Sequence, residues 1–282
     1  MYSPAKESIS IHRDLCTRIK KSSHYRQIHE MHGRMQEYTP QYTAMMNAYA
    51  SAMKEYFRDP SVYDTKIKPI LAQLTRYDEM VSPMKARMHE YTKHLTSSAL
   101  DRVSANPMHS DKGSFTFTGE NIGNAQYTVD QIKRIMHPDI FDNLVVTIQV
   151  NDTVQQSRVQ PLSTGYLVTL PSQYTTGDVA HEIGHVIEMY KPDIMVRAKQ
   201  FQASRTRGEN YQLLSKIMPE HAYDSEYCRA GNFPDPYCGK ITKDGSTEVF
   251  AMGLEFMVID PITFAHVDPE YFQMILDCIR GV

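Results

Sequence analysis

Glycine is almost absent from the first hundred residues, and this restricts what they can fold into. Between residues 8 and 103 the chain has one glycine, Gly33. Apolar residues there recur every four positions, as one stripe of a helix does, in Met45, Tyr49, Met53 and Phe57. The sequence therefore predicts a mainly α-helical first part.

Residues 104–114, SANPMHSDKGS, collect turn-forming and small polar residues, and the apolar period changes after them. GSFTFTG, NLVVTIQV and TGYLVTLPSQ are typical of strands, and the segment around VDQIKRIM is typical of a short helix. We therefore expect a helical region over residues 1–105 and an α+β domain over residues 106–282.

The charge is unevenly divided along the chain, although the net charge is only −3. Residues 1–100 carry 15 Lys and Arg against 10 Asp and Glu, and residues 101–282 carry 15 against 23. The first part contains no strongly basic run, so nucleic-acid binding is not expected. No apolar segment is long enough to span a membrane, and the N-terminus lacks the apolar core of a signal peptide. We expect neither a membrane anchor nor classical secretion.

The four cysteines show no CxxC spacing, so reduced thiols are expected: Cys16, Cys228, Cys238 and Cys278. Cys228 and Cys238 lie ten residues apart in a loop-like region. In an oxidising compartment they could pair, and the sequence leaves this open.

The segment DVAHEIGHVIEMY, residues 178–190, carries the motif HExxH on an expected helix. Residues four apart lie on one helical face, so His181 and His185 can bind the same metal ion. Glu182 is offset from that face and suits the general base that takes a proton from a zinc-activated water. Thr176 or Asp178 is expected to cap this helix, and Lys191-Pro192 to end it.

A catalytic zinc site needs a third protein ligand besides the two histidines. Glu188 lies on the same helix, but a further turn from the metal, so a structural or supporting role is expected for it. A second apolar helix is predicted between a Ser246 cap and Asp260-Pro261. It carries Glu248 and Glu255, and buried carboxylates need partners. Zinc for Glu248 and an imidazole N–H for Glu255 would provide them; the alternative is that both carboxylates reach solvent.

Four blocks of the last third resemble the gluzincins, in particular metallopeptidases of the anthrax-lethal-factor type. The blocks are HEIGHVIE, PDPYCGK, STEVFAMGLEFM and DPEYFQMILDCIRG. More narrowly, they are similar to metallopeptidase domains of tailed-phage and prophage head-morphogenesis (minor head) proteins. The resemblance covers roughly residues 140–282 and implies a zincin-like fold with one Zn²⁺ per chain. It implies His181, His185 and Glu248 as ligands and Glu182 as base.

Sites of this kind commonly use a tyrosine or histidine to stabilise the oxyanion. The resemblance makes Tyr237 the first candidate, and Tyr223 and His221 are the alternatives. The strand GYLVTLP, before the HExxH helix, would be the edge along which an extended peptide substrate aligns.

Two functions from different classes follow. The first is a phage or prophage zinc metalloendopeptidase that acts on a head or host protein, located in the bacterial cytoplasm or the virion. The second is a virion-associated or injected structural protein that uses the zincin fold as a scaffold. In both, residues 1–105 would dock to capsid or other virion proteins.

The C-terminal segment DPEYFQMILDCIRGV predicts a closing helix. Asp268 suits the N-cap, Pro269 the first turn, and Gly281 the end of the helix. One apolar stripe is expected to pack on the helix of Glu248: Phe272, Ile275, Leu276 and Ile279.

Overall fold

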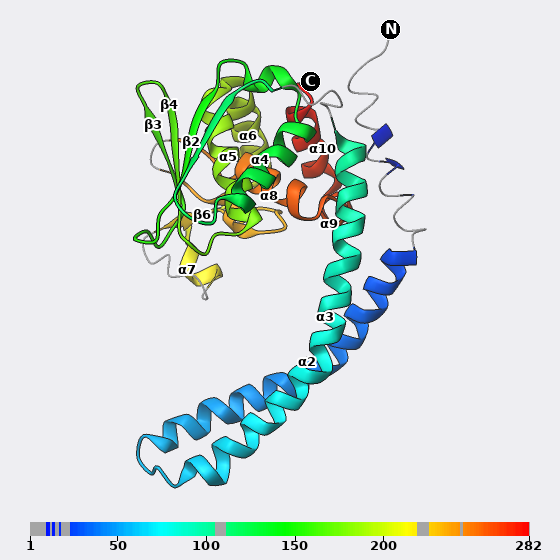
Figure 1. Cartoon of the computed structure of the whole chain (residues 1–282), viewed down its shortest axis with the longest axis vertical. Coiled ribbons are helices and arrows are strands. Elements are labelled where there is room, and N and C mark those ends of the chain that lie inside the picture. Colours follow the sequence, from blue (N-terminus) through cyan, green and yellow to red (C-terminus); the bar gives the residue numbers. More distant parts are fainter. Residues whose placement is uncertain are drawn as a thin grey trace. The chain divides into compact units, whose positions relative to one another are not determined.

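The computed structural model describes residues 10, 11, 13, 14, 17, 23–104, 111–218, 226–242 and 245–281 (Figure 1). The chain has mixed α/β structure and divides into two compact units. One unit is Thr17–Leu95, and the other is Met1–Cys16 with Thr96–Val282. The expected boundary was at residues 104–114. The units instead divide within helix α3, Lys68–Val103, whose last residues belong to the second unit.

The unit Thr17–Leu95 is helical, as its glycine-poor sequence predicts. It contains α2, Ser23–Tyr56, the π-helical turn η1, Tyr63–Ile67, and the first part of α3. Ala52, Val62 and Ile67 form a small core, against which further residues pack: Tyr49, Met53, Tyr56 and Ile70. Phe57, expected in the apolar stripe, is 82% exposed because α2 ends one residue before it.

The second unit contains a four-stranded sheet with the order β1-β2-β4-β3. Its strands are β1, Ser114–Thr118, β2, Val145–Val150, β3, Arg158–Leu162, and β4, Gly165–Leu170. The first three strands in this order run parallel, whereas β3 pairs antiparallel with β4. Strand β4 is therefore internal, and its expected role as the edge strand is wrong; β3, which the sequence did not predict, forms that edge.

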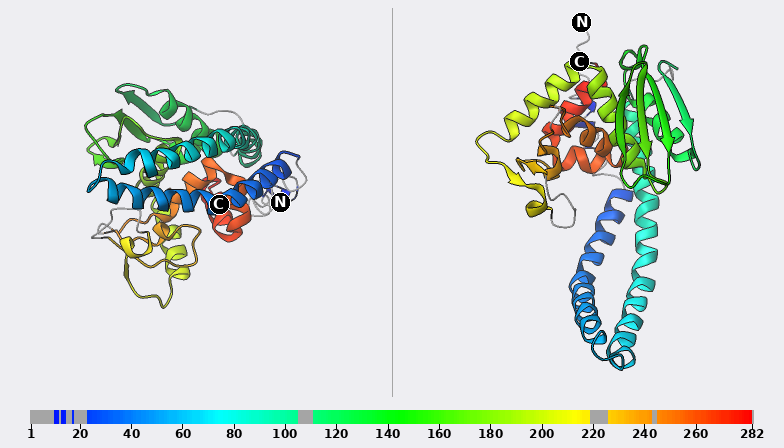
Figure 2. Two further views of the ribbon diagram at one scale, coloured as in Figure 1. Left: turned by 90° about the horizontal axis from the view of Figure 1, so that it is seen from below. Right: turned by 90° about the vertical axis from the view of Figure 1, so that its left-hand side faces the viewer.

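Helices cover one face of this sheet, as the alternating burial of β2 requires: Val146, Ile148 and Val150 are buried, whereas Val145 is exposed. Figure 2 shows the sheet as one layer with helices beside it. They include α4, Gly123–Ile135, and α5, Thr176–Tyr190. Helix α6, Pro192–Arg205, packs against α5 and α8.

Three C-terminal helices complete the second unit: α8, Val249–Ile259, α9, Pro261–Val267, and α10, Pro269–Ile279. Short elements lie between α6 and α8: β5, Gln212–Leu213, α7, Leu214–Ile217, β6, Tyr227–Cys228, and the 3-10 turn η3, Pro236–Gly239. In the described parts of the chain, no helix is both long and apolar enough to cross a bilayer.

The closing helix forms as predicted. The Asp268 side chain accepts a hydrogen bond from the Tyr271 backbone, Pro269 opens α10, and Gly281 has a positive φ. The four residues of the predicted stripe are fully buried: Phe272, Ile275, Leu276 and Ile279. A β-carbon on Gly253 of α8 would lie 2.3 Å from Ile275 Cδ1, so α10 packs directly on α8.

Candidate metal centre

Helix α5 presents two imidazoles from successive turns. The Nε2 atoms of His181 and His185 are 3.1 Å apart. Thr175 is the N-cap, rather than Thr176 or Asp178. Its side chain accepts from the Asp178 backbone while the Asp178 carboxylate accepts from the Thr175 backbone, a capping box that fixes the start of the helix.

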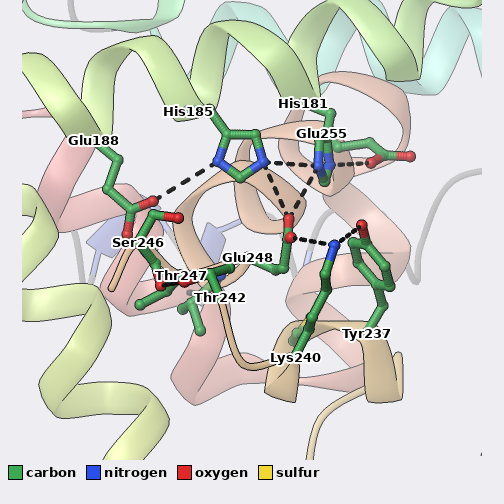
Figure 3. Close-up of polar contacts among 12 residues, drawn as sticks. His181, His185, Glu188, Tyr237, Lys240, Thr242, Ser246, Thr247, Glu248 and Glu255 are labelled. Atoms are coloured by element: carbon green, nitrogen blue, oxygen red, sulfur yellow. Dashed lines mark hydrogen bonds and ion pairs between the residues drawn. The ribbon is translucent and has the colours of Figure 1, made fainter. Parts of the chain in front are cut away.

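Glu248 brings a carboxylate to these imidazoles from the start of α8. Its Oε2 lies 3.2 Å from His181 Nε2 and 3.1 Å from His185 Nε2 (Figure 3). The three atoms thus form a nearly equilateral triangle. In a tetrahedral site with bonds of about 2.0–2.1 Å, ligand atoms are about 3.3–3.4 Å apart. The group His181, His185 and Glu248 could therefore hold a metal ion.

One atom of this group lacks the partner that its burial requires. Glu248 Oε2 is buried and has no hydrogen-bond partner. Burial opposes the charge on Glu248, but His181 and His185 outweigh it and hold the pKa of this carboxyl well below its usual range. Burial likewise opposes the charge on His181, yet Glu248 and Glu255 raise its pKa to about 10. A cation is thus favoured here, and a metal ion would compete with the proton for the site.

Two further carboxylates lie on the other side of the imidazoles. Glu255 Oε2 is 3.2 Å from His181 Nδ1, as predicted for an imidazole N–H partner. Glu188 Oε2 is 3.9 Å from His185 Nδ1, which is too long for a hydrogen bond. Thr247 Oγ1 donates to Glu188 Oε1 at 2.5 Å. Glu255 and Glu188 therefore surround the ligands and are not part of the triangle.

Glu182 lies beside the triangle without belonging to it. Its side chain is buried, with 7% of the residue exposed. Burial raises the pKa of its carboxyl, although the nearby charges of His181 and His185 act in the opposite direction. This placement is compatible with a group that exchanges protons near the metal position.

Tyr237 reaches the same region from η3. Its ring centroid lies 6.2 Å from that of His181. The Asp235 side chain caps this turn by accepting from the Tyr237 backbone at 2.8 Å. The structure thus brings the first oxyanion candidate to the site, whereas the alternatives His221 and Tyr223 lie outside the described residues.

Lys240 is a site residue that the sequence analysis missed. Its Nζ lies 3.2 Å from Glu248 Oε1 and donates to the Tyr237 hydroxyl at 2.9 Å. Figure 3 shows Glu248 between the imidazoles and Lys240. The PDPYCGK block contains Lys240, but its spacing gives no indication that the ammonium meets a ligand carboxylate.

The start of α8 differs from the expectation. Glu248 occupies the N-cap position, without a capping hydrogen bond from its side chain, and Ser246 does not cap the helix. Thr247 Oγ1 instead accepts from the Val249 backbone at 3.3 Å. The Glu248 carboxylate therefore does not cap the helix and contacts the two imidazoles and Lys240 instead.

Within the described parts of the chain, no cysteine belongs to the group that could hold a metal ion. Cys228, Cys238 and Cys278 are buried free thiols, so Cys228 and Cys238 do not pair in this structure. Cys16 lies outside the described residues.

A comparison with models of known protein families found no match to this chain, and searches of curated proteins and of solved structures found none either.

Proposed function

We propose that this chain is a zinc-dependent metallopeptidase with a gluzincin-type site in a zincin-like fold. The observation that carries the proposal is the triangle of His181 Nε2, His185 Nε2 and Glu248 Oε2, with edges of 3.1–3.2 Å. Structural zinc sites use four protein ligands, whereas catalytic sites use three and keep one position open. Among the described residues, three side chains form the group, which supports the catalytic type.

In this proposal, each residue next to the triangle has its own role in peptide hydrolysis. When bound, zinc supplies a Lewis acid that polarises the peptide carbonyl and activates a water molecule. Glu182 takes the proton of the attacking water at its carboxylate and delivers it to the leaving amine. Tyr237 donates its hydroxyl hydrogen to the oxyanion. Glu255 accepts the Nδ1 hydrogen of His181 and so directs Nε2 toward the metal.

The substrate in this proposal is an extended protein segment. Strand β3 forms the outer edge of the sheet next to β4, so a peptide that adds as a strand would pair with β3. Backbone N–H groups alternate sides along a strand and Pro161 has none, so only the residues of β3 whose N–H points away from β4 would provide donors.

The biological setting is a further part of the proposal and depends on the resemblance of residues 140–282. It is a phage or prophage protein that cleaves a head or host protein, with the helical first part as its docking region. In the alternative, a virion-associated scaffold, the fold would need no general base. The burial of Glu182 beside the ligands favours the enzyme.

The proposal is tested with zinc-loaded wild-type protein and Glu182→Gln on a peptide library analysed by mass spectrometry. We expect specific cleavage by the wild type, a loss of turnover of about 10²-fold or more in Glu182→Gln, and one zinc per chain in both. Glu120→Gln, at an exposed position in the same unit, is the matched control and should remain active. Zinc-loaded wild type that cleaves no peptide would instead support the scaffold.

A further inference from the structure

Lys240 connects the metal ligand Glu248 to the rest of the site. Its side chain is 15% exposed, and its ammonium meets three oxygens: Tyr237 Oη at 2.9 Å, Glu226 Oε1 at 3.1 Å and Glu248 Oε1 at 3.2 Å. An ammonium group has three N–H donors and no acceptor. Each donor therefore has one oxygen partner, and the head group is fixed from three directions.

This contact separates the two oxygens of Glu248. Oε1 lies against Lys240, whereas Oε2 lies against the two Nε2 atoms and has no hydrogen-bond partner. A carboxylate can bind zinc through one oxygen or through both. For Glu248 to use both, Oε1 would have to leave a largely buried ion pair with Lys240, and breaking a buried ion pair is strongly unfavourable.

The backbone around Lys240 is held as firmly as its side chain. The Lys240 N–H donates to the Tyr237 carbonyl at 2.9 Å, and the Ile241 N–H donates to the Tyr227 carbonyl at 2.9 Å. The Arg229 N–H donates to the Gly239 carbonyl at 3.0 Å. The Lys240 side chain thus extends from a fixed main chain, which a residue needs if it is to position another.

We propose that Lys240 is a positioning residue that restricts Glu248 to ligation through Oε2 alone. The metal ion then has three protein ligands and keeps its fourth position for water and substrate. If both oxygens of Glu248 bound, the coordination number would rise and the open position would be obstructed. This inference rests on the proposed metal centre and adds to it how the carboxylate binds.

The test uses cobalt(II) in place of zinc, because four-coordinate cobalt(II) absorbs visible light far more strongly than five- or six-coordinate cobalt(II). Wild-type protein and Lys240→Met are each loaded with one cobalt per chain. We expect intense visible bands in the wild type and a severalfold weaker spectrum in Lys240→Met. The exposed Lys216→Met is the matched control and should keep the wild-type spectrum.

A wild-type cobalt spectrum in Lys240→Met would overturn the proposal. If that variant does not fold, X-ray absorption on the zinc-loaded wild type decides. We expect four ligands with a single oxygen from Glu248, and two Glu248 oxygens would reject the inference. Wild type that is four-coordinate but cleaves no peptide rejects the peptidase alone, whereas wild type that binds neither metal rejects both proposals.

Discussion

Gly184 contacts Ala251 so closely that a β-carbon on Gly184 would lie 2.6 Å from the Ala251 Cα. Gly184 precedes the ligand His185 on α5, and Ala251 lies three residues after the ligand Glu248, near the start of α8. The absence of a side chain at Gly184 therefore lets the two helices approach until the ligand atoms are 3.1 Å apart. In HEIGH, the glycine as well as the two histidines therefore matters for the candidate metal centre.

Gly184→Ala should destabilise the protein and weaken metal binding. The added methyl group must separate α5 from α8, and overpacking of this kind costs about 1–3 kcal/mol. Thermal unfolding and competition with a chromophoric chelator measure the two effects. Gly123→Ala, in α4, is the matched control, because a β-carbon there meets nothing within 4 Å. Equal stability of the two variants would show that the helices do not need this contact.

Wild-type protein should bind one zinc ion per chain. Replacing one of the three ligands should weaken zinc binding more than replacing a residue that only contacts a ligand. Glu248→Ala removes a ligand and should abolish stoichiometric binding, whereas Glu255→Gln removes the carboxylate beside His181 Nδ1 and should weaken binding about 10–100-fold. Elemental analysis and chelator competition provide the measurements. If Glu248→Ala binds zinc as tightly as wild type, the assignment of the third ligand is wrong.

Much of this centre could be predicted because it depends on local periodicity. His181 and His185 share a helical face through their spacing alone, and Glu248 and Glu255 are conspicuous as acidic residues on an apolar helix. The same reasoning predicted β1, β2, β4 and the cap of α10, since alternation and capping are properties of short segments.

The remaining features depend on tertiary contacts that no short segment encodes. Lys240 joins the site only because η3 packs beside α8, while main-chain hydrogen bonds hold the Lys240 segment to the β6 segment. Strand β3 escaped prediction because Pro161 is unfavourable in a strand, yet an edge position tolerates it. The two compact units divide between residues 95 and 96, inside α3, whereas the loop composition at residues 104–114 follows the end of that helix.

Asp268 stabilises the fold in two ways, through an ion pair with Arg205 and through the N-cap of α10, and substitutions should distinguish them. Asp268 accepts two hydrogen bonds from the Arg205 guanidinium, at 2.6 and 2.8 Å, and caps α10 through the Tyr271 backbone. Asp268→Ala removes both and leaves Arg205 largely buried without its main partner, so we expect a loss of about 3–5 kcal/mol.

Chemical denaturation of three variants measures this effect. Asp268→Asn keeps a capping oxygen and should lose less than Asp268→Ala. Glu270→Gln touches the same Arg205 but at an exposed side chain, and should cost at most about 1 kcal/mol. If Glu270→Gln were as damaging as Asp268→Ala, exposure would not govern the strength of these pairs.

Stability should fall in alkaline solution through the buried thiols. Burial raises the pKa of the Cys278 thiol to about 12 from its model-compound value of 9.0. Between these values the folded thiol keeps its proton while the unfolded thiol ionises, so the unfolding free energy decreases as pH rises. Denaturation at pH 8 to 11 should show this decrease, and Cys278→Ala should make it shallower. An unchanged slope in Cys278→Ala would assign the decrease to other groups.

The main-chain bonds between β6 and the segment of Lys240 have a consequence for sequence variation. Backbone N–H and C=O groups are the same in almost every residue, so Tyr227, Arg229 and Ile241 could change without moving Tyr237 or Lys240. Gly239 is the exception, because a β-carbon there would lie 1.7 Å from the Arg229 carbonyl oxygen. Many substitutions should therefore be tolerated at Tyr227, Arg229 and Ile241, whereas Gly239 should tolerate none.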